Sequence, residues 1–245
     1  MTKRTAFVTG SGQNIGRAIA LRLAQDGFNV VVNGRSNRQS CEDVAAEIRK
    51  SGGAAAIAMG DVSTAAGAKA VAAEAIAAFG GVDALIHNAA IRPETPFLEM
   101  SEDEWHSVMN TNFGASFWLA RATLPGMIER GWGRIVNFAG MNAMNGYNGR
   151  AHVSASKHAA WGLTKALAKE FGPKGVTTNI VSPGPIRPEA GDAKMQEHIR
   201  SQANKIPVGR LGEPSEIAAT VSLLVSNDGG FINGQLIQVN GGTQC

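Results

Sequence analysis

The sequence predicts an α/β protein in which helices cover both faces of one parallel β-sheet. Short runs of almost continuously apolar residues, of strand length, alternate with longer amphipathic stretches. Strands without polar alternation are typical of a sheet buried between two layers of helices. Regular strand–helix alternation implies parallel strands joined by right-handed crossovers. No linker or change of composition divides the 245 residues, so we expect a single domain over residues 1–245.

The elements can be assigned in order along the chain. The strand candidates are Thr5–Thr9, Phe28–Asn33, Ala54–Met59, Val82–His87, Arg134–Phe138, Thr177–Val181 and Gln235–Val239. Amphipathic stretches between these runs predict helices. They include Ile15–Asp26, Asp43–Lys50, Ala65–Phe79 and Trp161–Phe171. Glycines and prolines fall between the elements, which is where turns are expected.

Composition argues against several classes of protein. The formal net charge is only +3, and no basic run is long enough for a nucleic-acid surface. Cys41 and Cys245 lie in unrelated contexts, which predicts neither a disulfide framework nor a metal site. The N-terminus runs directly into a strand pattern, and no apolar stretch reaches the ~18–20 residues of a membrane span. We therefore expect a cytoplasmic protein without a membrane or nucleic-acid partner.

A glycine-rich turn follows the first predicted strand and precedes the first predicted helix. It reads Thr9-Gly10-Ser11-Gly12-Gln13-Asn14-Ile15-Gly16. Glycines let the backbone approach a pyrophosphate closely, and the helix N-terminus supplies free N–H groups and a partial positive charge. An ordinary strand-to-helix turn is the alternative. The position between first strand and first helix favours a dinucleotide site of Rossmann type.

Further motifs resemble, in the same order, those of the short-chain dehydrogenase/reductase family. The turn resembles the family's Thr-Gly-x-x-x-Gly-x-Gly pattern, with Asn14 at the middle glycine; asparagine tolerates positive φ better than most residues. The other matching segments are Gly60–Val62, His87–Ala90, Gly133–Asn137, Ser182–Ile186, Ile206–Arg210, Glu213–Pro214 and Val239–Gly242. The resemblance implies a doubly wound, seven-stranded parallel sheet, a nicotinamide dinucleotide cofactor and a small-molecule substrate.

The end of the second predicted strand favours NADP over NAD. NAD enzymes usually place an Asp or Glu there to bind the ribose 2′-hydroxyl. This segment has no carboxylate and offers Asn33, Arg35 and Ser36, of which the arginine can pair bidentately with a 2′-phosphate. Against NADP, Gln13 stands where many NADP-dependent members of the family carry a second basic residue. The alternative interpretation of Arg35 is a solvent-exposed loop arginine.

The resemblance also implies which residues contact the cofactor. Asp61 and Val62 resemble the adenine-contacting pair after the third strand, and Asn88 with Ala89 resembles the motif after the fourth. The predicted set is Gly10, Ser11, Gln13, Asn14, Ile15, Gly16, Asn33, Arg35, Ser36, Asp61, Val62, Asn88, Ala89, Lys157, Pro183, Gly184 and Ile186. Asp61 and Asn88 have strand-end capping as an alternative role, but both follow strands at the edge where such folds bind ligands.

The catalytic positions of the family are only partly filled. In the family a Tyr exchanges the substrate proton, a Lys four residues later holds the nicotinamide ribose, an earlier Ser orients the substrate, and an Asn in the preceding helix holds a water. Lys157 and Asn112 match the Lys and the Asn. Val153 stands at the Tyr position and Gly140 at the Ser position. Because general acid–base catalysis contributes about 10²–10⁴ in rate, we expect ordinary carbonyl reduction to be impaired.

Two nearby residues are candidate substitutes for the lost hydroxyls. Tyr147 is the only tyrosine, and His152 adjoins the Tyr position but lies about 100° away around a helix. The predicted substrate pocket comprises Gly140, Tyr147 and Val153. Two function classes remain open: an NADP-dependent oxidoreductase with an altered site, and an inactive dinucleotide-binding homologue that acts as a partner subunit or regulator. A lyase-type reaction has no positive support in the sequence.

Two further expectations concern a lid and the oligomer. The long polar segment 185–207, with a short helical stretch around Asp192–Ala203, predicts a lid over the substrate. By resemblance we expect a homotetramer, since the family buries its long fourth and fifth helices against partner subunits. The matching helix carries more apolar residues than one sheet face requires. These residues are Phe113, Phe117, Trp118 and Leu119.

Overall fold

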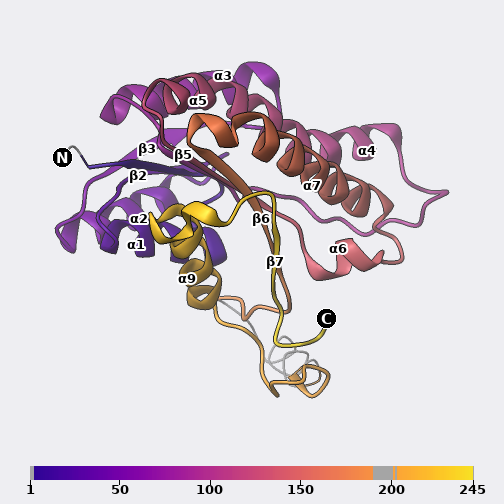
Figure 1. The fold of residues 1–245 in the computed structure, drawn as a ribbon. Coiled ribbons are helices and arrows are strands. Elements are labelled where there is room, and N and C mark those ends of the chain that lie inside the picture. Colours follow the sequence, from indigo (N-terminus) through magenta and orange to yellow (C-terminus); the bar gives the residue numbers. More distant parts are fainter. Residues whose placement is uncertain (1–2, 190–200, 202, 245) are drawn as a thin grey trace.

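The structure, a computed structural model, describes residues 3–189, 201 and 203–244. Within these residues a seven-stranded parallel sheet forms the centre of the molecule, in the order β3-β2-β1-β4-β5-β6-β7 (Figure 1). The strands are β1 (Thr5–Val8), β2 (Asn29–Gly34), β3 (Ala55–Met59), β4 (Ala84–His87), β5 (Gly133–Phe138), β6 (Val176–Pro183) and β7 (Leu236–Val239). The predicted fold class is confirmed.

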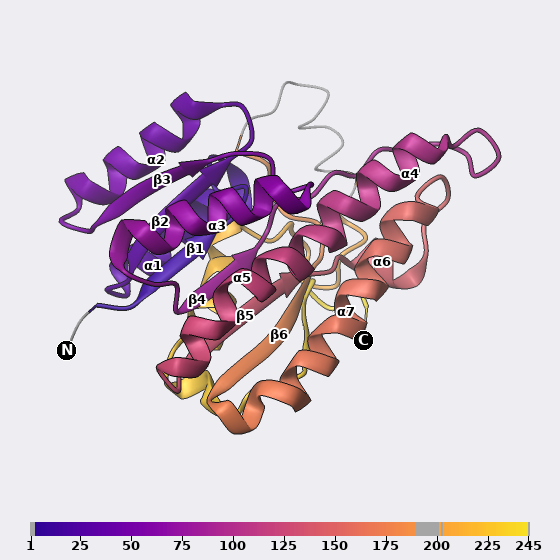
Figure 2. The same cartoon turned by 90° about the horizontal axis from the view of Figure 1, so that it is seen from above.

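Helices form a layer on each face of this sheet. They are α1 (Asn14–Gln25), α2 (Arg38–Lys50), α3 (Ala65–Phe79), α4 (Glu102–Met109), α5 (Ala115–Glu129), α6 (Met141–Asn145), α7 (Ala151–Phe171) and α9 (Pro214–Val225), with short turns η1 (Asn110–Gly114), η2 (Gly172–Lys174) and η3 (Asp228–Phe231). One layer contains α1, α2 and α9, and the other contains α3, α5 and α7 (Figures 1 and 2).

Alternate residues of each central strand supply two separate hydrophobic cores. In β1, Ala6 and Val8 belong to the core under α1 and α9, whereas Phe7 belongs to the core under α3 and α5. All three side chains are fully buried. A strand covered on both faces has no solvent-facing side, which explains why these runs lack polar alternation.

Predicted and observed elements differ mainly at their ends. The second helix begins earlier than predicted, at Arg38, because the Asn37 side chain accepts a hydrogen bond from the Ser40 N–H at 3.1 Å and caps it. The helix predicted from Trp161 begins at Ala151, where its first half packs against α4 and η1. Tertiary packing therefore extends this helix beyond its amphipathic pattern.

The fold places a crevice at the carboxyl edge of the sheet between β1 and β4. β1 leads into α1 on one face, whereas β4 leads toward α4 and α5 on the other. Because the chain leaves these neighbouring strands in opposite directions, the loops after them separate. Ligands of open α/β sheets bind at such a switch point.

The segment 185–207 is only partly described. The helical stretch predicted around Asp192–Ala203 lies largely outside the described residues. At the start of the segment, Ile186 forms an isolated parallel bridge with Gly212. In the described ranges, no helix is long and apolar enough to cross a membrane.

Candidate functional site

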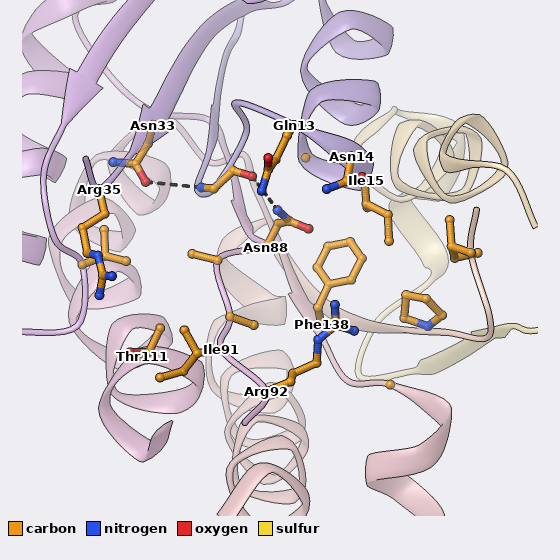
Figure 3. A pocket seen from close by; sticks show the side chains of 18 of the residues that line it. Gln13, Asn14, Ile15, Asn33, Arg35, Asn88, Ile91, Arg92, Thr111 and Phe138 are labelled. Carbon is orange, nitrogen blue, oxygen red and sulfur yellow. Dashed lines mark hydrogen bonds between the residues drawn. The ribbon is translucent and has the colours of Figure 1, made fainter. Parts of the chain in front are cut away.

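A cavity of about 610 Å³ opens at the switch point between β1 and β4. It brings together most of the residues predicted to contact a cofactor, from the ends of five strands and the loops after them and from helix α7 (Figure 3). Those that line it are Gly10, Gln13, Asn14, Ile15, Gly16, Asn33, Arg35, Asp61, Val62, Asn88, Ala89, Lys157, Pro183, Gly184 and Ile186. Two predicted residues do not line it. Ser11 is buried beneath the turn, where its hydroxyl donates to the Val8 carbonyl oxygen, and Ser36 is exposed.

The glycine-rich turn has the shape that a close approach to phosphate requires. Asn14 adopts a φ of 51°, the one positive φ of a non-glycine residue in the described chain. A Cβ on Gly16 would collide with the carbonyl oxygen of Gly10. The Asn88 amide donates to the Thr9 and Gly10 carbonyl oxygens at 3.1 and 2.9 Å, which joins this turn to the loop after β4. Asparagine therefore replaces a glycine here without loss of the left-handed turn.

The N-terminus of α1 already holds an anion. The carboxylate of Glu189, from the loop after β6, accepts a hydrogen bond from the Asn14 N–H at 2.7 Å. In return, the Glu189 N–H donates to Asn14 Oδ1 at 3.1 Å. The residue at the N-cap position, Gln13, makes no capping hydrogen bond with its own side chain. The carboxylate lies where free N–H groups and the helix dipole favour negative charge, which is the property that binds pyrophosphate.

The two polar residues at the end of β2 have different environments. Asn33 is buried; its Oδ1 accepts from the Gly10 N–H at 3.3 Å, and its Nδ2 donates to the Ala58 carbonyl oxygen at 2.8 Å. Its amide therefore ties the glycine-rich turn to β3. Arg35 is exposed, lines the cavity, and has no ion pair or hydrogen bond among the described residues. Its guanidinium is free to bind an anionic ligand.

Lys157 is a buried amine on the wall of the cavity. Its residue is 3% exposed, and it makes no hydrogen bond or ion pair with the residues the structure describes. Burial, and to a lesser extent the charge of Arg92, lowers the pKa of Lys157 to about 7. The side chain can therefore exchange a proton near neutral pH.

Asn112 holds the loop after β4 in place. It lies in η1, a π-helical turn between α4 and α5, where such turns often mark functional sites. Its Oδ1 accepts from the Ile91 N–H and its Nδ2 donates to the Ile91 carbonyl oxygen, both at 2.9 Å. The same amide lies 3.3 Å from Ser156 Oγ on α7. Asn112 therefore joins this loop to the helix that carries Lys157.

The predicted substrate-pocket residues are only partly brought together. Gly140 lines the cavity, and a Cβ there would meet no heavy atom within 4 Å. Val153 does not line it, because Val108, Ala143 and Ile91 cover its side chain. Tyr147 also lies outside the lining.

Neither candidate substitute for the hydroxyls lies in the cavity wall. Tyr147 is 45% exposed and stacks against Arg150, whose Cζ lies 4.8 Å from the ring centre. His152 is fully buried, with Nε2 2.9 Å from Glu104 Oε1, while its Nδ1 accepts from the Val153 N–H. The early start of α7 directs His152 toward α4, so it points away from Lys157.

Several lining residues had not been assigned to the site. They include Ile91, Arg92, Thr111, Phe138 and Arg187. Ile91 and Arg92 follow the motif after β4, and Phe138 ends β5. The rule that ligands bind at the carboxyl edge would have identified these three. Thr111 lines the cavity because it lies in the π-helical turn η1, and the sequence carries no clear signal for such a turn.

A buried polar chain lies behind Lys157. His87 Nδ1 is 3.0 Å from Ser116 Oγ, which donates to Asn137 Oδ1, and the Asn137 amide donates to Thr164 Oγ1. Burial and the nearby Lys157 lower the pKa of His87 to about 3, so the imidazole is neutral. The four residues of this hydrogen-bond chain include no acid, so none of them forms an ion pair with Lys157.

This sheet, turn and cavity together define a dinucleotide-binding protein of Rossmann type. A family model described as Enoyl-(Acyl carrier protein) reductase matches residues 10–244. The chain belongs to this branch of the short-chain dehydrogenase/reductase family. The relatives that follow match 98–99% of its length.

Two curated relatives and one solved structure illustrate the similarity. The 3-oxoacyl-[acyl-carrier-protein] reductase FabG of Staphylococcus aureus is 37% identical over 242 residues, covering 99% of this chain and 98% of the relative. The acetoacetyl-CoA reductase of Shinella zoogloeoides is 38% identical over 240 residues, or 98% of each. A putative NAD(P)-dependent gluconate 5-dehydrogenase from Beutenbergia cavernae, solved with NADP bound at low occupancy, superposes with a TM-score of 0.90 at 36% identity, covering 99% of this chain and 97% of that chain.

Proposed function

We propose that this protein is an NADP-dependent oxidoreductase of the cytoplasm that acts on a small carbonyl, alcohol, imine or activated double bond. The supporting observation is one cavity that joins the α1 turn, the unpaired Arg35 and the buried Lys157. The named activities of the relatives, two of them reductases, and the NADP of the solved structure support the same conclusion. The active site is atypical because it lacks the Ser and Tyr of the family, with Gly140 and Val153 at those positions.

Different residues of the chain bind different parts of the cofactor. The backbone at the start of α1, with no room for a side chain at Gly16, holds the pyrophosphate. Arg35 pairs with the 2′-phosphate, and Lys157 contacts the nicotinamide ribose. The bound nicotinamide supplies or accepts the hydride. Phosphate would displace the Glu189 carboxylate from the Asn14 N–H, since both use the same end of α1.

Lys157 is the proton source in this proposal. Among the described residues, Tyr147 and His152 do not line the cavity, and the lining arginines do not give up a proton in proteins. Asp61 follows β3, at the end that binds the adenosine half of the cofactor. In a reduction, the ammonium of Lys157 gives its proton to the new alkoxide oxygen, directly or through water, and solvent then restores it. Its pKa of about 7 matches this task at neutral pH.

The proposal predicts that the Arg35→Ala variant loses its preference for NADP. Removing one charge-assisted bidentate contact costs about 1.5–3 kcal/mol, or about 10- to 150-fold in the Kd for NADPH. The Kd for NADH should hardly change. Fluorescence titrations of both nucleotides against the parent and the variant measure the effect. Equal affinities for NADPH and NADH in the parent would contradict the assignment.

A turnover screen separates this function from its inactive alternative. The parent is saturated with NADPH and offered a panel of ketones, imines and enones. NADPH oxidation with any member supports an enzyme. Tight NADPH binding without turnover anywhere would favour a partner subunit or regulator instead.

We also propose a homo-oligomer, a tetramer by analogy with the family. Not all of the apolar side chains predicted for the subunit interface are exposed. Leu119 is buried in the core and Trp118 packs against it, whereas Phe117 is 39% exposed and available to a partner subunit. We expect multi-angle light scattering to give a multiple of the 25.5 kDa chain mass at micromolar concentration. A mass of one chain would refute the proposal.

A further inference from the structure

We infer that the substrate is anionic, a carboxylate-bearing carbonyl or hydroxy compound, and that Arg92 binds its carboxylate. The inference rests on the proposed function and names its substrate class. Arg92 lies on the loop after β4 and lines the cavity. Figure 3 shows its side chain rising from this loop toward Phe138, into the cavity rather than away from it.

The charged residues of the cavity wall are mostly cations. Among the described residues they are Arg35, Arg92, Lys157 and Arg187, against one acid, Asp61. Arg187 is neutralised by Glu213, whose Oε1 lies 2.7 Å from its Nε. Arg35 and Asp61 follow β2 and β3, at the end that binds the adenosine half of a dinucleotide. Arg92 and Lys157 remain at the other end without a carboxylate partner among the described residues.

The nearest acidic neighbour of Arg92 in the sequence is already paired. Glu94 Oε2 lies 3.0 Å from Arg150 Nη2, and this ion pair joins the loop after β4 to the residue that precedes α7. Arg92 itself makes no ion pair or hydrogen bond within the described part of the chain. Its charge reaches Lys157, whose pKa it helps to lower. Two cations therefore face the same space, and an anion between them would relieve their repulsion.

The phosphates of the cofactor do not supply this anion. The pyrophosphate belongs at the N-terminus of α1 and the 2′-phosphate at Arg35, so groups other than Arg92 bind both. The nicotinamide ring carries no negative charge. Since no described residue and no part of the cofactor supplies this anion, we assign it to the substrate. A guanidinium binds a carboxylate through two parallel hydrogen bonds, so Arg92 would orient the substrate as well as attract it.

The loop that carries Arg92 is fixed on both sides. Asn112 bonds both backbone groups of Ile91, each at 2.9 Å. On the other side, the Thr95 N–H donates to the Gly149 carbonyl oxygen at 2.8 Å. A loop held at two points positions a side chain reproducibly, which distinguishes Arg92 from an arginine on a loose surface loop.

The surroundings of Arg92 limit the rest of the substrate. Apolar groups of Ile91, Phe138, Pro183 and Ile186 line the cavity around the cations. This wall favours a compact hydrocarbon body between the carboxylate and the reacting carbon. A short oxo acid fits these requirements, and the corresponding hydroxy acid is the product of its reduction.

The test compares short oxo acids with their methyl esters, using NADPH and the parent, Arg92→Gln and Arg92→Lys. We expect the parent to favour each acid over its ester in kcat/KM by about 10- to 100-fold. Arg92→Gln should lose this preference through a higher KM for the acid. Because the variant also shifts the pKa of Lys157, the readout is the acid-to-ester ratio of kcat/KM within each protein at one pH. Arg92→Lys keeps the positive charge but loses the bidentate guanidinium, so it should retain part of the preference for the acid. Lys69→Gln, on the exposed side of α3, controls for the change of net charge.

A binding measurement keeps this result separate from the proposed function. Calorimetry compares butanoate with butanamide, each added to the NADP complex and to the free protein. We expect butanoate to bind, and to bind at least about 10-fold less tightly in Arg92→Gln. Equal kcat/KM for acid and ester in the parent, or equal affinity for butanoate in the parent and Arg92→Gln, overturns the inference. In either case, NADPH-dependent turnover of the ester leaves the proposed function intact. If NADPH does not bind, the proposed function fails, and butanoate with the free protein still decides the role of Arg92.

Discussion

Introducing Tyr at Val153 and Ser at Gly140 together should raise or create NADPH-dependent reduction of a generic diketone by about 10²–10⁴-fold, the usual contribution of a general acid. Position 153 lies one helical turn before Lys157 on α7, so a tyrosine there shares a helix face with the lysine. A serine Cβ at position 140 enters open space. The Tyr ring must pass Ile91 and Ala143, which now cover Val153.

Matched variants identify the hydroxyls as the cause of any gain. Phe at position 153 with Ala at position 140 adds nearly the same volume without either hydroxyl, and should gain nothing. Tyr147→Phe should leave the native activity unchanged, because Tyr147 is half exposed and lies outside the cavity lining. NADPH oxidation with diketone at saturating cofactor is the measurement. Normal NADPH binding without any gain in the double variant would show that position 153 does not face the reacting carbon.

The Lys157→Met variant should lose about 10²–10⁴ in the rate of NADPH-dependent reduction, because it removes the proposed proton source. In the parent, the rate of reduction should fall as pH rises through about 7, where the amine loses its proton. Arg92 faces this amine from the loop after β4 and His87 from β4 itself; His87 stays neutral at these pH values. Arg92→Gln should therefore move the fall in rate to higher pH. A rate of reduction independent of pH between 6 and 9 would argue against Lys157 as the donor.

Lys157 also makes the free energy of unfolding depend on pH. Its pKa is lowered from 10.5 to about 7 in the folded chain, so the unfolded chain binds more protons between these values. Stability of the cofactor-free protein should therefore rise with pH across this window, with a limiting slope of about 1.4 kcal/mol per pH unit.

Lys157→Met should remove this slope and raise stability near pH 7. Lys165→Met, on the exposed side of the same helix, should preserve the slope. Urea unfolding followed by circular dichroism at several pH values distinguishes the two. An unchanged slope in Lys157→Met would mean that this amine is not desolvated as the structure indicates.

Sequence alone determined the architecture and identified most of the residues that line the cavity at the carboxyl edge of the sheet. Apolar runs without alternation required two covering layers, and seven of them alternating with helices required a parallel sheet with its ligand edge at the strand ends. The backbone of the turn at Asn14 was also predictable, because its left-handed φ of 51° depends on local sterics that asparagine tolerates. Such properties follow from residues adjacent in the chain.

The side-chain environment of the reacting end was decided only by tertiary structure. α7 begins at Ala151 because it packs against α4 and η1, and that start directs His152 to Glu104 and leaves Tyr147 outside the cavity. Asn33 is occupied by contacts with the turn and β3, which its place in β2 did not indicate. Arg92 faces Lys157 across elements separated by more than sixty residues of sequence. Side-chain direction and charge proximity of this kind depend on packing between distant segments, which local periodicity does not encode.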